Sequence, residues 1–391
     1  MKCHDVAVIG AGPAGCSAAL ALARHGFDVV LLEKAALPRY KTCGGGLLHR
    51  AFKLLPPLPS SVIERSFHSV ALNFLGTKMN YTATRAQPIV HLTMRADLDC
   101  HLARTAAGAG AHVIESCPVL HVAEHADFVE INSARETFRA KFVVAADGVY
   151  SPTAKAAGWS ELPALAPALE HEIYLDPENF ARFSQMPRFD FNSIAAGYSW
   201  VFPKRDHLSV GILSTRRVET GLQKKLADYL NLLGITRIQK TEKHGYLIPL
   251  APRREPLARG RILLIGDAAG LVDPVMAEGI SHAILSGQLA AAALSDCRLD
   301  VTRVADFYQS LLREKILREL RAARFLARVL YHHPRIRDGT FRLGGQKLCE
   351  FVTGIVMGER SYHEALRNPS SYLKLLGVPL LSLSARRAAG N

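Results

Sequence analysis

A lone cysteine stands directly before three consecutive glycines in the stretch Cys43-Gly44-Gly45-Gly46, and Lys41 lies two residues upstream. A thiol can donate a proton or act as a nucleophile, and a neighbouring ammonium group lowers the pKa of a cysteine. Glycines, which have no Cβ, let the backbone lie close to a flat ring or an extended chain. Cys43 is therefore a candidate proton donor or a residue that gates the face of a bound group. A small thiol that only packs remains an equal alternative.

Aromatic side chains alternate along the stretch Tyr198-Ser-Trp200-Val-Phe202-Pro203. Residues with this period share one face of a β-strand, so the three rings would form one wall of an apolar groove. Ordinary sheet core gives the same pattern, and by itself the stretch favours that interpretation. Tyr198 also carries a hydroxyl and is a second candidate proton donor, although a wall residue is the simpler interpretation.

A glycine-rich turn follows the first apolar run of the chain, where residues 10–15 have the sequence GAGPAG, and Glu33 ends the next apolar run. The first glycine permits a tight turn, the second lets a pyrophosphate approach the backbone, and the third lets helix and strand pack closely. The helix N-terminus then faces the phosphates, and the acid accepts hydrogen bonds from a ribose diol. An acid at this place disfavours the 2′-phosphate of NADP, so we expect NAD or FAD. The cofactor-binding residues expected from this unit are Gly10, Gly12, Pro13, Ala14, Gly15, Glu33 and Lys34.

Two further strand-end turns narrow the cofactor. Asp147-Gly148 and Gly266-Asp267 each end an apolar run, and Pro274 follows the second. Each turn alone is equally well an ordinary turn, but at these spacings the three elements resemble the FAD fingerprints of the para-hydroxybenzoate hydroxylase superfamily. That resemblance implies that Asp267 binds ribityl or ribose hydroxyls and that a helix starting at Gly279 and Ile280 faces the flavin. It also assigns a cofactor contact to Arg95, for which a solvated arginine at a helix start is the alternative.

The chain is further similar to the geranylgeranyl reductase family, in which FAD-dependent enzymes hydrogenate isolated C=C bonds of prenyl chains. The similarity rests on residues 41–46, on residues 198–203 and on the run Asp273-Pro274…Glu278-Gly279-Ile280, and it extends vaguely to residues 354–362. The chain departs from the family pattern at Ala277 and Leu213, where glycine is common, which leaves the identity of the prenyl compound open. The resemblance implies the following roles: Cys43 and Tyr198 at the reacting bond; Lys41, Cys43, Gly44 and Gly45 at the flavin; Gly46, Leu47, Tyr198, Trp200, Phe202 and Pro203 at the substrate.

The elements that must position these residues indicate an α/β fold. β-α-β patterns at residues 5–34 and apolar runs at 142–148 and 261–267 predict a parallel, Rossmann-like sheet. Alternating segments between about 165 and 250 predict an inserted antiparallel sheet, and helical periodicity dominates beyond 303. We therefore expect three units: a discontinuous FAD-binding domain at 1–75, 92–164 and 255–300; a substrate-binding sheet domain at 76–91 and 165–254; and a C-terminal helical region at 301–391.

Composition excludes several classes of protein. Basic residues outnumber acidic ones, 48 to 35, but they are scattered, so we expect attraction to anionic partners without a nucleic-acid arm. The seven cysteines are dispersed with no metal-ligand spacing, so we expect no metal and reduced thiols in a cytoplasmic protein. The sequence contains no run of about 18 apolar residues, so we expect no membrane-spanning helix.

Some questions remain open from sequence. Arginines 313, 318, 321, 324 and 328 accompany an apolar stripe, and either a packed helix with a solvated basic face or a helix that contacts an anionic membrane fits this pattern. The electron donor is NAD(P)H or reduced ferredoxin, the latter requiring a carrier protein as partner. An FAD-dependent monooxygenase or halogenase is the first alternative function, and a non-catalytic or electron-transfer flavoprotein is the second.

Overall fold

The computed structural model describes residues 2–367. Its first layer is a sheet in which β1 (Cys3–Ile9) lies between β2 (Val29–Leu32) and β11 (Thr137–Ala145), parallel to both. Residues 6–9, 29–32 and 142–145 of these strands are continuous apolar runs because both faces of the sheet are covered there, as is typical of parallel sheets. The predicted parallel sheet is confirmed. Its strand order is β17 (Ala258–Arg259), β18 (Ile262–Leu264), β11, β1, β2, β8 (His112–Ile114), with the hairpin β9 (Val119–Glu124) and β10 (Val129–Ser133) attached to β11.

Residues 112–122 do not form one continuous strand. Ser116 has a positive φ of 52°, and Pro118 has no N–H to donate to a sheet. The chain therefore turns after β8 and starts β9 in a different direction. Residues 117–119 at this turn line the large cavity described below.

Three helices pack against the parallel sheet and carry the cofactor-type motifs. α1 (Pro13–Arg24) contacts both α3 (Arg95–Gly108) and α8 (Ile280–Asp296). The helix starts expected at Arg95 and at Gly279 and Ile280 are confirmed. The other helices before residue 300 are α2 (His49–Phe52), α4 (Pro152–Ala156), α5 (Pro177–Phe183), α6 (Leu222–Leu233) and α7 (Gly266–Ala269).

The second layer is a seven-stranded sheet that is antiparallel except for one parallel pair, β13 with β5. It contains residues 69–74, which sequence analysis places with the FAD-binding segments, because β5 pairs with both β6 and β13. The chain therefore joins this sheet at residue 69, before residue 76, where the sequence predicts that the substrate domain starts. Its order is β16 (Ile238–Pro249), β12 (Leu165–Leu175), β15 (Leu208–Ser214), β14 (Gly197–Pro203), β13 (Arg188–Phe191), β5 (Ser69–Phe74), β6 (Asn80–Thr84).

A small third sheet joins the two layers. β3 (Gly46–Leu48) and β4 (Arg65–Phe67) both pair with β7 (Val90–Leu92). The cysteine-glycine stretch leads directly into β3. The pairing of β3 with β7 therefore fixes the end of that stretch. Residues 90–91, expected in the substrate domain, belong to this small sheet instead.

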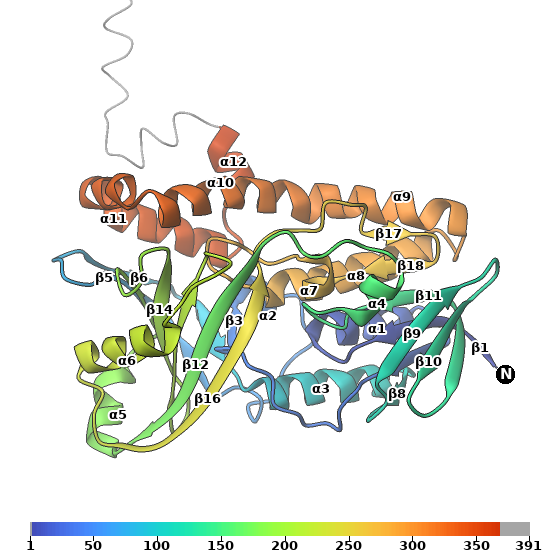
Figure 1. The fold of residues 1–391 in the computed structure, drawn as a ribbon, viewed down its shortest axis with the longest axis horizontal. Helices are drawn as coiled ribbons and strands as arrows, with labels where there is room; N and C mark the ends of the chain where they lie inside the picture. The colour runs from blue at the N-terminus through green and yellow to red at the C-terminus, as the bar shows by residue number, and fades with distance from the viewer. Residues whose placement is uncertain (1, 368–391) are drawn as a thin grey trace, which may run out of the picture.

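The C-terminal helices run along one side of the molecule and cover both large sheets (Figure 1). α9 (Val301–Leu312) continues through a π-helical turn, Arg313–Leu317, into α10 (Arg318–His332), and α11 (Pro334–Val356) and α12 (Tyr362–Arg367) follow. The predicted helical region is confirmed as far as residue 367, and residues 368–391 lie outside the described part of the chain. Within residues 2–367 no helix is both long and apolar enough to span a membrane.

Candidate flavin and substrate site

The glycine-rich turn between β1 and α1 has the geometry that phosphate binding needs. Gly10 has a φ of +104°, and a Cβ there would lie 2.5 Å from the carbonyl oxygen of Ala146. A Cβ on Gly15 would overlap the carbonyl oxygen of Gly10, so these two glycines let helix and strand pack closely. At Gly12 the nearest heavy atom would be Arg95 Nη2 at 3.7 Å, and no side chain caps α1. The open backbone N–H groups of α1 therefore face the cavity, as an anion-binding helix start does.

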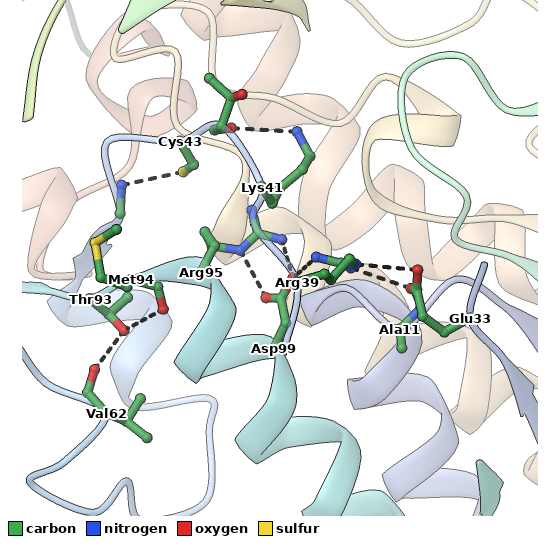
Figure 2. A network of polar contacts seen from close by, with 12 residues as sticks. Ala11, Glu33, Arg39, Lys41, Cys43, Val62, Thr93, Met94, Arg95 and Asp99 are labelled. Atoms are coloured by element: carbon green, nitrogen blue, oxygen red, sulfur yellow. Dashed lines mark hydrogen bonds and ion pairs between the residues drawn. The ribbon is translucent and has the colours of Figure 1, made fainter. Parts of the chain in front are cut away.

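A chain of buried charges runs beside this turn, as Figure 2 shows. Arg95 Nε and Nη2 donate to the two carboxylate oxygens of Asp99, each at 2.8 Å, and Arg39 Nη1 donates to Asp99 at 2.9 Å. Arg39 also pairs with Glu33 at 3.2 Å, and Glu33 accepts the backbone N–H of Ala11 at 2.8 Å. Glu33 is thus held at the end of β2, where the sequence places the ribose-binding acid.

Two more charged groups line the cavity between these motifs. Burial, reinforced by the charge of Arg95, lowers the pKa of Lys41 to about 8. Its ammonium lies 3.1 Å from the centre of the Tyr246 ring. Burial also raises the pKa of Asp267, whose carboxylate has no hydrogen-bond partner among the described residues. Lys41 and Arg95 are two cations near the open start of α1, and the Asp267 carboxylate is a free acceptor. These groups fit a dinucleotide with a pyrophosphate and a polyhydroxylated chain.

Val275 and Met276, the segment before α8, are held by two tyrosine hydroxyls. The Tyr198 hydroxyl donates to the carbonyl oxygen of Met276 at 2.6 Å, and the Tyr331 hydroxyl donates to that of Val275. Between this segment and α8, Ala277 has a φ of 50°, a left-handed conformation that glycine adopts more easily. The segment therefore brings the start of α8, at Gly279 and Ile280, to the cavity wall.

Arg50 fixes the other side of that segment. Its guanidinium donates to Asp273 at 3.2 Å and to Glu278 at 2.8 Å, and it also bonds Ser281 at the start of α8. Burial opposes ionisation of Glu278, but the charge of Arg50 prevails and lowers the pKa of that carboxyl. The approach to α8 is consequently charged and rigid although it borders an apolar cavity.

The cysteine-glycine stretch separates the polar and the apolar parts of the site. Gly45 donates its N–H to Cys43 Sγ at 3.4 Å, and the thiol is half-buried at the cavity wall. A Cβ on Gly44 would lie 3.0 Å from the Phe202 ring and 3.2 Å from Trp200 Nε1. The glycines therefore permit close contact with the aromatic wall of β14.

A cavity of about 680 Å³ joins all of these groups. Beyond Cys43 its lining is almost wholly apolar and comes from the seven-stranded sheet, the small sheet, the segment before α8, and α10 and α11. The rings of Tyr198, Trp200 and Phe202 follow one another along β14 with centroids 6.2 Å apart at each step. The other apolar lining residues include Leu72, Ile89, Phe189, Leu213, Leu330, Phe341, Val352 and Val356.

Comparison with known proteins agrees with this geometry. Residues 3–296 match the family model described as an FAD binding domain. A digeranylgeranylglycerophospholipid reductase of Methanothermobacter thermautotrophicus is 32% identical over 81% of this chain and 85% of its own length. The chain belongs to the geranylgeranyl reductase family of FAD-dependent oxidoreductases.

Two other relatives extend the comparison. A menaquinone reductase of Mycobacterium tuberculosis is 29% identical over 83% of this chain and 84% of its own length. The solved structure of a geranylgeranyl bacteriochlorophyll reductase-like protein from Thermoplasma acidophilum has the same fold, with a TM-score of 0.77, 23% identity and 99% of each chain covered. This geranylgeranyl reductase family member thus shares its complete described architecture with a solved relative.

The structure gathers most of the predicted site residues of this family member around the cavity. Leu47 is the clearest exception, because it is fully buried against Ile280 and Ile284 and does not line the cavity. Asp147 lines the cavity, but its carboxylate accepts from the Ser151 hydroxyl and the Thr153 N–H and so caps α4. The predicted residues that line it are Gly10, Gly12, Pro13, Ala14, Glu33, Lys34, Lys41, Cys43, Gly44, Gly45, Gly46, Arg95, Asp147, Gly148, Tyr198, Trp200, Phe202, Asp267, Gly279 and Ile280; those that do not are Gly15, Leu47, Pro203, Gly266 and Pro274.

Sequence analysis missed two groups of residues. The first is the pair Arg39 and Asp99, of which only Asp99 carried a signal, four residues after Arg95 on the same helix face. The second is the inner face of α11, where Cys349, Val352 and Val356 line the cavity. Their spacing is helical, but nothing in it distinguishes a cavity wall from ordinary core.

Proposed function

We propose that this protein reduces isolated C=C bonds in the prenyl chain of a lipid or quinone, with reduced FAD as the hydride source. The observation that supports it most is one continuous cavity, polar where the dinucleotide motifs meet and apolar from Cys43 to α11. A cavity wall of aliphatic and aromatic side chains with few polar groups suits a prenyl chain better than a polar aromatic substrate.

The residues of the polar end suit FAD. The N-terminus of α1 at Gly12 would hold the pyrophosphate, with Arg95 and Lys41 nearby. Glu33 would accept from a ribose hydroxyl, and the free carboxylate of Asp267 from the ribityl chain. The start of α8 would stabilise negative charge on the reduced flavin ring. When bound, reduced FAD supplies a hydride to one carbon of the double bond.

The chain itself must supply the proton for the other carbon and must exclude water. Trp200, Phe202 and the apolar faces of α10 and α11 exclude solvent around the alkene. Cys43 is the better placed proton donor, because its Sγ only accepts a hydrogen bond and its S–H is not committed. The Tyr198 hydroxyl already donates to Met276, so its role in this proposal is to hold the segment before α8.

Replacement of the thiol tests this role. Cys43→Ala should bind FAD as the wild type does and lose about 100-fold in alkene reduction, within the range expected for a general acid. Cys43→Ser is the matched control, since it keeps a weaker acid of similar size. Full activity of Cys43→Ala would mean that the thiol only packs.

The proposal includes contact with an anionic membrane through α10. Arg318, Arg321, Arg324 and Arg328 are exposed on this helix, and Phe325 between them is 57% exposed. The opposite face packs on the molecule, and Leu330 and Tyr331 line the cavity, so a lipid bound outside lies close to the substrate path. Flotation should bring the protein up with anionic but not neutral liposomes, and Arg321→Glu/Arg324→Glu should abolish this. Equal flotation of that variant would remove the helix from the proposal.

The function is tested by anaerobic reoxidation of the reduced protein. A prenyl diphosphate, a prenylated glycerolipid and a prenylquinol are supplied separately, and the reactive class should gain two hydrogens in mass per reduced bond of its prenyl chain. Adding NAD(P)H or reduced ferredoxin to the oxidised protein then identifies the electron donor. Unchanged substrate in every arm would contradict the reductase proposal, and a product that forms only with oxygen would indicate a monooxygenase or halogenase.

A further inference from the structure

The turn that carries Cys43 is anchored by a buried carboxylate outside every motif considered so far. The backbone N–H of Cys43 donates to Glu170 Oε2 at 2.9 Å. Glu170 lies on β12, and only 1% of its surface is exposed. A carboxylate oxygen that accepts a backbone N–H so far from water holds that backbone firmly, since the broken bond would leave that buried oxygen without a donor.

A buried ammonium anchors the next residue of the same turn. Lys204 Nζ donates to the carbonyl oxygen of Gly44 at 2.7 Å and to that of Thr93 at 2.9 Å. Lys204 is fully buried, and a Cβ on Gly45 would lie 2.5 Å from its Nζ. Lys204 therefore joins the turn to the segment after β7. A Cβ on Gly45 would also overlap the carbonyl oxygen of Thr93, so only glycine fits at that position.

The carboxylate also joins the turn to the aromatic wall. Ser209 donates its hydroxyl to Glu170 Oε1 at 2.5 Å, and Trp200 Nε1 donates to Ser209 Oγ at 3.4 Å. Trp200 and Cys43 are thereby connected through two side chains, Ser209 and Glu170, that belong to neither sequence motif. A shift of Glu170 would move the thiol and the ring wall together.

Glu170 is in an environment that opposes its charge. Burial, with the nearby charge of Glu172, raises the pKa of Glu170 to about 7, and Lys204 and the Cys43 N–H act in the opposite direction. A protonated Glu170 accepts the Cys43 N–H less strongly than a carboxylate does. The titratable and charged groups that face it are Glu172 on its own strand, Lys204 after β14, His244 opposite it on β16, and Tyr40 and Cys43 on the turn.

We propose that Glu170 and Lys204 are positioning residues that fix the Cys43–Gly45 turn between the flavin and the substrate wall, and that the ionisation of Glu170 sets how firmly Cys43 is held. The consequence for catalysis rests on the proposed reductase function. We call the contacts of Glu170 and Lys204 with the Cys43–Gly45 turn the clamp. The clamp is a property of the folded protein and is measured without turnover.

Hydrogen exchange of the FAD-loaded protein tests the clamp. Glu170→Ala should reduce the protection factor of peptides covering residues 41–48 about tenfold or more, the scale of a lost hydrogen bond to a charged group. In the wild type the same peptides should be better protected at pH 8 than at pH 6, because Glu170 is ionised at the higher pH. Glu170→Gln keeps an acceptor for the Cys43 N–H but cannot ionise, so its protection factor should not change between these pH values.

Matched variants separate the clamp from general loss of structure. Glu172→Gln changes a buried acid on the same strand that contacts His207 at 2.5 Å and not Cys43. It should retain the pH effect and move it to lower pH, because the charge that raises the pKa of Glu170 is gone. Lys204→Met should lower protection at residues 44–46 at both pH values. If Glu170→Ala does not bind FAD, the Glu170→Gln comparison decides.

Wild-type protection at residues 41–48 in Glu170→Ala, or a pH effect that persists in Glu170→Gln, would overturn the proposal. These outcomes are independent of the proposed reaction. Confirmed protection changes in a protein that reduces no prenyl substrate would leave the clamp in place and refute the reductase function alone. An active enzyme without the protection changes would refute only the clamp.

Discussion

The two ends of the cavity are built differently. At the polar end, Gly12, Glu33 and Arg95 stand at the ends of strands or the starts of helices and are held by hydrogen bonds to backbone and to buried charges. At the apolar end, side chains from β5, β14, α10 and α11 meet mainly by packing, and hydrogen bonds from Tyr198 and Tyr331 are made to backbone carbonyls at the cavity edge. Polar geometry depends on a few groups at fixed spacings, whereas the apolar wall depends on the sum of many contacts from distant parts of the chain.

This difference implies that the ends respond differently to substitution. Removing one charge at the polar end leaves its partner buried without compensation, which is costly. Replacing one apolar side chain changes the shape of the far end but leaves the cofactor geometry intact. Four predictions test this separation.

The largest effect is expected at Arg95. Arg95→Met leaves Asp99, which is fully buried, with only Arg39 as a partner. FAD affinity should fall about 100-fold, or roughly 3 kcal/mol, as for a broken buried ion pair. Fluorescence titration measures it, and Arg95→Lys should recover little because an ammonium lacks the planar fork with which the guanidinium binds both carboxylate oxygens of Asp99. Unaltered affinity in Arg95→Met would show that the buried charges are not part of the cofactor site.

A bulky residue on α11 should act at the other end alone. Val352→Phe adds a ring inside the apolar cavity, where overpacking costs about 1–3 kcal/mol. Prenyl-chain reduction should fall about tenfold or more, while FAD affinity stays as in the wild type. Val352→Ile is the control of smaller volume. A matching loss of FAD affinity would mean that the ends are not separate.

FAD affinity should depend on pH through Lys41. The pKa of Lys41 is lowered to about 8 in the free protein, so the ammonium is charged below that pH and becomes neutral above it. Because bound phosphates favour the charged form, affinity should be constant below pH 8 and fall about fivefold as the pH rises toward 10, a loss of about 1 kcal/mol. Lys41→Gln should bind more weakly and show no such fall; a fall of the same size in that variant would assign the titration to another group.

The smallest effect is expected between the two ends, at Ala277. Its φ of 50° is unfavourable for any residue with a Cβ. Ala277→Gly should raise the free energy of unfolding by about 0.5–1 kcal/mol, and Ala277→Val should lower it. Denaturant unfolding measures both. A destabilised Ala277→Gly would show that the methyl group contributes more by packing than the backbone loses by strain.

The same contrast between the polar and the apolar end explains which parts of the site could be predicted from the sequence. Gly10, Gly12, Gly15 and Glu33 were predictable because each meets a local steric or hydrogen-bonding need at a fixed spacing. The parallel sheet, the antiparallel sheet and the helical end follow from apolar periodicity. The entry of residues 69–74 into the second sheet was not predictable, because pairing between distant strands leaves no local pattern.

The direction in which individual side chains point was the other feature that the sequence did not predict. Leu47 and Gly46 are adjacent in sequence, but alternation along β3 turns Leu47 into the core while Gly46 lines the cavity. Glu170 could not have been recognised as the partner of Cys43, 127 residues away. The division into domains and the roles of the individual site residues stay predictions for the experiments above.

The most direct test of the central claim is a single anaerobic turnover of the dithionite-reduced protein, with excess dithionite removed. Wild-type protein mixed with a prenylated lipid or a prenylquinol should reoxidise its flavin and yield a product whose prenyl chain is heavier by two hydrogens per flavin. Val352→Phe, with the same FAD content, should reoxidise and form product at least about tenfold more slowly. Reoxidation without a heavier product, or equal rates in both proteins, would contradict a flavin that reduces a prenyl chain lying in the apolar cavity.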